Sequence, residues 1–122
     1  MFSEIFASTL IASCLNGGGS YLGGTKAELT RTDDETTYRL VVEEFKGPDG
    51  DGKSGVIADE STSYMNAIHM EDGMMYQFKG WEFEVFNLST TPYHDKVTGE
   101  VRRLNSLGDV IETTPMACDF NG

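Results

Sequence analysis

The sequence has little of several residue types, and each shortage excludes a class of protein. Only 9 of the 122 residues are lysine or arginine, against 20 aspartates and glutamates, which gives a formal net charge of −11. Nucleic-acid-binding surfaces need clustered lysine and arginine, so this balance argues against a nucleic-acid partner. No apolar stretch approaches the roughly 20 residues that a membrane-spanning helix requires, so no integral membrane segment is expected.

Cysteine is also scarce, because the chain contains only Cys14 and Cys118, near its opposite ends. In an oxidising compartment these residues could form a disulfide that closes most of the chain into one loop. In a reducing cytosol they would stay as buried thiols. We expect the disulfide in preference to the thiols, and therefore a secreted or periplasmic protein in preference to a cytoplasmic one.

Aromatic residues, in contrast, are plentiful enough to build a folded core. The chain has seven phenylalanines, five tyrosines and one tryptophan, which is too much aromatic mass for a disordered acidic tail. A chain of this length normally forms one domain, so residues 1–122 are expected to fold as a single unit.

The N-terminal segment has an apolar pattern that fits a helix. Its apolar residues recur at helical spacing, which predicts a helix over residues 2–15 and a glycine-rich linker over residues 16–24. These apolar residues are Phe2, Ile5, Phe6, Leu10, Ile11, Cys14 and Leu15. The alternative is a lipoprotein signal that ends at Cys14, but Glu4 stands where such a signal carries positive charge.

Residues 25–114 alternate between apolar and polar side chains, which predicts an antiparallel sheet, with residues 115–122 as a C-terminal tail containing Cys118. Asp72-Gly73 predicts a two-residue hairpin turn. The alternation changes phase at Lys79-Gly80, which indicates either a β-bulge or a strand covered on both faces. The expected fold is α+β and mainly β, with the N-terminal helix packed on an antiparallel meander or small, partly open barrel of about six strands.

One loop carries carboxylates at a spacing that resembles part of a calcium-binding loop. Asp49, Asp51 and Glu60 occupy the first, third and twelfth positions of such a loop. Lys53 and Ser54 stand where that loop normally carries a ligand and a glycine. Calcium binding through these three carboxylates is therefore one candidate property, while ordinary turn chemistry is the other explanation.

The sequence shows no catalytic signature around His69 or His94, so an enzyme is not expected. The leading hypothesis is a non-enzymatic acidic binding protein, such as an inhibitor or immunity protein that masks a basic partner. Aromatic and cationic side chains near the irregular Lys79-Gly80 segment are the candidate contact residues. They are Lys79, Trp81, Tyr64 and Tyr76. The alternatives are a carrier of a small molecule or lipid, a self-assembling structural module such as a homodimer, and a calcium-binding protein.

Overall fold

The computed structural model describes residues 7–17, 23–46, 54–90 and 96–121, and this part of the chain is built from β-strands. A single turn of 3-10 helix, η2, covers Tyr64–Asn66. The strands are β1 Ser8–Gly17, β2 Gly24–Thr32, β3 Thr37–Phe45, β4 Ser54–Ser63, β5 Ala67–Met70, β6 Gly73–Phe78, β7 Trp81–Phe86, β8 Val97–Leu104 and β9 Val110–Phe120.

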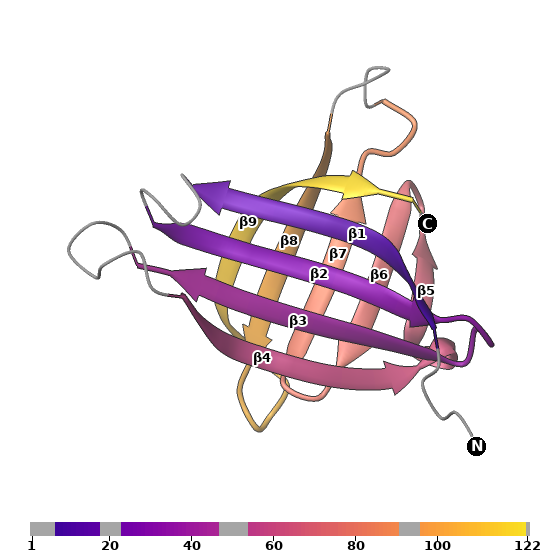
Figure 1. The fold of residues 1–122 in the computed structure, drawn as a ribbon, viewed down its shortest axis with the longest axis horizontal. Coiled ribbons are helices and arrows are strands. Elements are labelled where there is room, and N and C mark those ends of the chain that lie inside the picture. The colour runs from indigo at the N-terminus through magenta and orange to yellow at the C-terminus, as the bar shows by residue number, and fades with distance from the viewer. Residues whose placement is uncertain (1–6, 18–22, 47–53, 91–95, 122) are drawn as a thin grey trace.

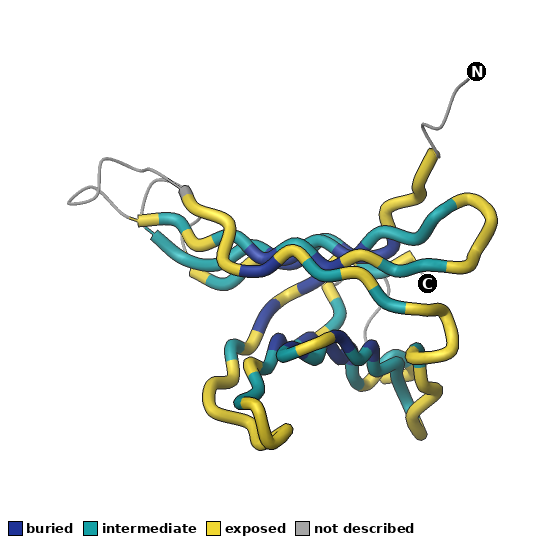
Figure 2. Tube along the Cα trace, turned by 90° about the horizontal axis from the view of Figure 1, so that it is seen from below, coloured by how far each residue is buried: buried dark blue, intermediate teal, exposed yellow. Residues whose placement is uncertain are grey.

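All nine strands belong to one antiparallel sheet, in the order β4-β3-β2-β1-β9-β8-β7-β6-β5. The sheet curls on itself, so that β1 to β4 cross over β5 to β8 (Figure 1). Seen from below, it forms two facing layers that are joined at the sides (Figure 2). The edge strands β4 and β5 are connected through η2, which leaves a nearly closed, barrel-like sheet.

The core lies between the two layers, where each strand turns alternate side chains inward. Its aromatic members are Tyr76, Phe78, Trp81 and Phe83. Tyr38 from β3 meets the Tyr76 ring edge-on, with centroids 4.9 Å apart, and Phe83 stacks against the same ring at 6.0 Å. Burial raises the pKa of the Tyr76 phenol well above its ordinary value, so this ring stays neutral.

The two halves of the sheet meet where β1 pairs with β9. The register places Cys14 directly opposite Cys118, and the two sulfur atoms are bonded at 2.06 Å. Both cysteines are buried. The disulfide that the sequence predicts is thus confirmed, and it links the first and last strands of the chain side by side.

The helix predicted over residues 2–15 is wrong for the part that the structure describes. Residues 8–17 form β1, while residues 1–6 lie outside the described part. A bulge between Leu10 and Ala12 shifts the pairing with β2, so that Ile11 and Ala12 are both buried. This break in strand alternation places apolar residues at a spacing that imitates a helix.

The sheet also extends beyond its predicted limits, with nine strands instead of about six. Residues 115–120 belong to β9 and are not a tail. The predicted linker over residues 16–24 contains the end of β1 and the first residue of β2, with residues 18–22 outside the described part. Within the described residues, no helix is long and apolar enough to cross a membrane.

The phase change at Lys79-Gly80 is a hairpin turn and not a bulge within one strand. Phe78 at the end of β6 pairs with Trp81 at the start of β7. Gly80 takes the left-handed conformation, with φ of 78°, which glycine adopts without steric cost. Phe78 and Trp81 can therefore both face the core.

The turn between β5 and β6 also differs from the prediction. Met70 pairs with Gly73, so the two turn residues are Glu71 and Asp72. The turn therefore lies one residue earlier than the predicted Asp72-Gly73 turn.

Removal of the disulfide should weaken the whole sheet. The double substitution Cys14→Ala and Cys118→Ala, or reduction of the native protein, should lower the free energy of unfolding by about 2–5 kcal/mol. The physical reason is that the bridge joins residues 104 positions apart, which restricts the unfolded chain. Urea unfolding with and without reductant measures this loss. An unchanged unfolding midpoint after verified reduction would contradict the prediction.

Candidate functional site

A cluster of charged side chains covers the outer face of β7 and β8. Strand alternation turns Glu82 and Glu84 outward while Trp81, Phe83 and Val85 face the core. The register then places Glu82 opposite Arg102 and Glu84 opposite Glu100 on β8. Because directly paired residues lie on the same face of a sheet, these four side chains meet outside the core. We call them the Arg102 cluster.

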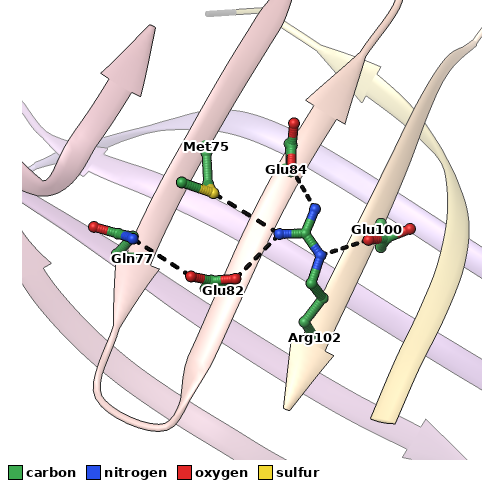
Figure 3. Close-up of polar contacts among 6 residues, drawn as sticks. All are labelled: Met75, Gln77, Glu82, Glu84, Glu100 and Arg102. Carbon is green, nitrogen blue, oxygen red and sulfur yellow. Dashed lines mark hydrogen bonds and ion pairs between the residues drawn. The ribbon is translucent and has the colours of Figure 1, made fainter. Parts of the chain in front are cut away.

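Arg102 lies at the centre of this cluster and contacts all three carboxylates (Figure 3). Its Nη1 donates to Glu82 Oε1 at 3.1 Å, its Nε donates to Glu100 Oε2 at 2.5 Å, and its Nη2 donates to Glu84 Oε1. On the β6 side, the Met75 sulfur lies 3.8 Å from Nη1. Gln77 Nε2 donates to Glu82 Oε2 at 3.4 Å. The guanidinium is therefore held in one orientation by several strands.

The Arg102 cluster is sheltered from water and carries excess negative charge. The Arg102 side chain is 14% exposed, and Glu84 is 8% exposed as a residue. Burial opposes the charged form of Arg102, but hydrogen bonds to Glu84, Glu100 and Glu82 outweigh it and raise the pKa of the guanidinium. Arg102 stays a cation, so one positive charge faces three carboxylates. The cluster as a whole therefore has more negative than positive charge.

A different ion pair, on the outer face of β3 and β4, shows the ordinary exposed arrangement. Arg39 and Asp59 make two hydrogen bonds, at 2.8 and 2.7 Å, with side chains 56% and 45% exposed. The hydrogen bond from Arg39 lowers the pKa of Asp59 below its ordinary value. Here one cation meets one carboxylate, so the pair balances its own charge.

Next to the Arg102 cluster, the outer face is hollowed where β6 begins. A pocket of about 220 Å³ lies there, and we call it the Gly73 hollow. Gly73 pairs with Met70 of β5, and a Cβ on Gly73 would come within 1.9 Å of the Val85 carbonyl oxygen. Only glycine fits this close approach. The residues that line the hollow are Met70, Glu71, Asp72, Gly73, Glu84, Val85, Phe86 and Asn87.

The rim of the Gly73 hollow is fixed by Asp72 in the β5–β6 turn. The two oxygens of its carboxylate accept hydrogen bonds from the Ser89 backbone amide at 2.9 Å and the Ser89 hydroxyl at 2.8 Å. Its backbone carbonyl accepts a third from the Leu88 amide at 3.1 Å. These bonds tie the segment after β7 to the β5–β6 turn and hold the rim of the hollow in place.

The residues predicted as partner contacts do not form one exposed patch. Lys79 is exposed in the β6–β7 turn and Tyr64 is exposed in η2. Tyr76 is 1% exposed within the core. Trp81 is also buried, with the Arg103 guanidinium 5.6 Å from its ring centroid. Of the four, only Lys79 and Tyr64 offer side chains to a partner in this structure.

The candidate calcium ligands lie partly outside the described residues. Asp49 and Asp51 belong to the segment that is not described, and Glu60 lies on β4 opposite Leu40. In the part of the chain that the structure describes, no group of three or more histidine, cysteine or acidic side chains is arranged to hold a metal ion. In the Arg102 cluster the guanidinium stands at the centre, where a metal would have to lie.

From the sequence, the paired carboxylates Glu82 and Glu84 are better explained as solvated strand positions than as a catalytic pair, and no pattern singles out Glu100 or Arg102. The available signal was a pair of charges two residues apart on each of two neighbouring segments. Such pairs also occur on ordinary solvated strand faces. Only the register of β7 against β8 brings three carboxylates to one guanidinium.

Comparison with protein-family models, with curated proteins and with solved structures finds no match for this chain.

The Arg102 cluster and the Arg39–Asp59 pair should respond very differently to loss of the cation. Arg102→Met should lower the free energy of unfolding by about 3 kcal/mol, because it leaves three sheltered carboxylates without a counter-ion. The matched control, Arg39→Met, removes a cation from an exposed pair and should cost only about 0.2–1 kcal/mol. Urea unfolding of both variants provides the comparison. Equal losses would contradict the sheltered character of the Arg102 cluster.

The Arg39–Asp59 pair should also give a small pH dependence of stability. Because the pKa of Asp59 is lowered in the folded state, its contribution is present at neutral pH and is lost as the pH falls through the folded pKa. The stability difference between wild type and Arg39→Met should therefore be full above the ordinary aspartate pKa of about 3.9 and should shrink as the pH falls below it, through the lowered folded pKa of Asp59. Unfolding curves from pH 7 to about pH 2.5 measure it, and a difference that grows on acidification would refute the prediction.

Proposed function

We propose that this protein is a non-enzymatic binding protein, such as an inhibitor or immunity protein, that engages a basic protein partner through the outer face of β5 to β8. The observation that supports this proposal most is the Arg102 cluster, in which three carboxylates share one guanidinium. A cationic group from a partner would neutralise the excess charge. Opposite charge would also speed the encounter of the two proteins.

The surroundings of the cluster suit a protein partner. Methionines occupy β5 and β6 beside it, with Met70 40% exposed at the edge and Met75 in contact with Arg102. Ile68, also exposed, pairs with Met75 across the same face. Flexible methionine side chains adapt to a partner surface, and sheltered charges surrounded by apolar atoms interact more strongly than charges in open water.

The carrier hypothesis receives less support from the described residues. A carrier needs an apolar cavity between the layers, commonly about 300–1,000 Å³. The space between the layers is occupied by Tyr76, Phe83 and Trp81. The Gly73 hollow is on the outer face and measures about 220 Å³. The surface charge therefore supports a protein partner better than the interior supports a small ligand.

Affinity capture with a charge-neutral variant tests the proposed function. The bait is the immobilised protein, and the variant carries Glu82→Gln, Glu84→Gln and Glu100→Gln, which keep amide oxygens beside Arg102. The matched control carries Glu28→Gln, Glu43→Gln and Glu112→Gln, which remove the same charge from other surfaces. Circular dichroism establishes that all three proteins are folded.

The expected result is a basic protein, identified by mass spectrometry, that wild type and the matched control retain and the cluster variant loses. Its retention should weaken steeply as salt rises from about 0.05 to about 0.5 M, because salt screens the attraction. A partner held equally by all three baits would contradict the role of the Arg102 cluster. Failure of every bait to retain a basic protein at low salt would contradict the proposed function itself.

A further inference from the structure

We propose that the Gly73 hollow is the anchor subsite for an arginine side chain of the basic partner. This inference rests on the proposed function and adds the place and chemistry of the central contact. The hollow opens on the same outer face as the Arg102 cluster, and Glu84 belongs to both. An arginine that enters the hollow would therefore reach the excess negative charge of the cluster.

The charge of the hollow selects a cation. Three of its lining residues are acidic, namely Glu71, Asp72 and Glu84, and no lysine, arginine or histidine lines it. Within the described residues, Glu84 is bonded to Arg102 through Oε1. Every buried side-chain oxygen there has a hydrogen-bond partner. Because no contact of Glu84 Oε2 is found among these residues, this oxygen keeps a small exposure to solvent, although Glu84 as a residue is only 8% exposed. This oxygen can accept a hydrogen bond from an incoming guanidinium.

The walls of the hollow favour arginine over a compact ammonium group. Met70 and Phe86 both line the hollow beside Gly73, so apolar side chains form part of its wall. A planar guanidinium can stack on the Phe86 ring and pair its nitrogens with a carboxylate. The lysine ammonium group is a compact charge, and it holds its bound water more strongly than a guanidinium does. A volume of about 220 Å³ suits one such side chain and is small for a drug-sized ligand.

Two acidic side chains of the hollow are already held in place by hydrogen bonds within the protein. Asp72 is held by Ser89 through both carboxylate oxygens, and Glu84 is held by Arg102. These contacts fix the acidic walls before the arginine arrives, so less conformational freedom is lost on binding. Glu71, exposed in the turn, adds a negative charge at the entrance.

Titration of the isotope-labelled protein with acetyl-arginine methylamide, followed by amide NMR shifts, tests the anchor. We expect saturable shifts centred on Gly73, Glu84 and Phe86, with a dissociation constant in the millimolar range. The citrulline analogue, which has the same shape without the charge, should give no saturable shift. Acetyl-lysine methylamide should bind at least several-fold more weakly. Equal binding of the citrulline or lysine compound would overturn the assignment to arginine.

Binding of the arginine probe to three Glu→Gln variants tests whether the probe occupies the Gly73 hollow. Glu84→Gln should weaken binding of the arginine probe about tenfold, since it removes a hydrogen bond to a charged acceptor. Glu71→Gln, in an exposed turn that does not support the fold, should weaken it about twofold to fivefold. Glu112→Gln, a matched charge removal on β9, should leave it unchanged. Equal effects of Glu71→Gln and Glu112→Gln would show binding by diffuse surface charge and would overturn the subsite.

The two proposals fail separately. If a basic partner depends on the Arg102 cluster but the arginine probe causes no saturable shift at the hollow, the anchor is wrong and the proposed function stands. If the arginine probe binds at the hollow as described but no bait retains a basic protein, the subsite stands and its assignment to a protein partner is overturned.

Discussion

The pairing of β1 with β9 is the contact on which the rest of the structure depends. It joins β2, β3 and β4 on one side to β5, β6, β7 and β8 on the other. The Cys14–Cys118 disulfide lies inside this pairing. Because the two halves are joined there, the sheet can curl so that its layers face each other and bury one core (Figure 2). That curl leaves the opposite side of β5 to β8 free to carry the charged cluster and the hollow.

The β-rich character and several of the strands could be predicted from local patterns, whereas β1 could not. Strand alternation and turn residues are local signals, and they predict β2, β3 and a hairpin after β5, whose turn lies one residue earlier than expected. In β1, the bulge between Leu10 and Ala12 disturbs the alternation, and the segment reads as an amphipathic helix. Pairing on both sides with β2 and β9, together with the Cys14 disulfide, overrides that local signal. These contacts are distant in sequence, so periodicity alone does not reveal them.

The candidate site depends on register even more than the fold does. The acidic composition is visible in the sequence and favours a basic partner, but it does not say which acids act together. Arg102 joins side chains from separate strand positions into one cluster, and the adjacent hollow lies beside Gly73. The sequence-based choice of Trp81 and Tyr76 as contact residues followed their aromatic character, yet both are buried in the core. A general preference for aromatics at interfaces cannot separate core aromatics from exposed ones.

The account's central claim is that a basic partner meets this protein at the outer face of β5 to β8. Carbodiimide labelling of carboxylates, with and without an octa-arginine peptide and read by mass spectrometry, tests the claim most directly. The account predicts that Glu71 and Glu100 lose labelling in the complex, while Glu43 and Glu112 keep theirs. Uniform protection of all four carboxylates, or protection confined to Glu43 and Glu112, would contradict it.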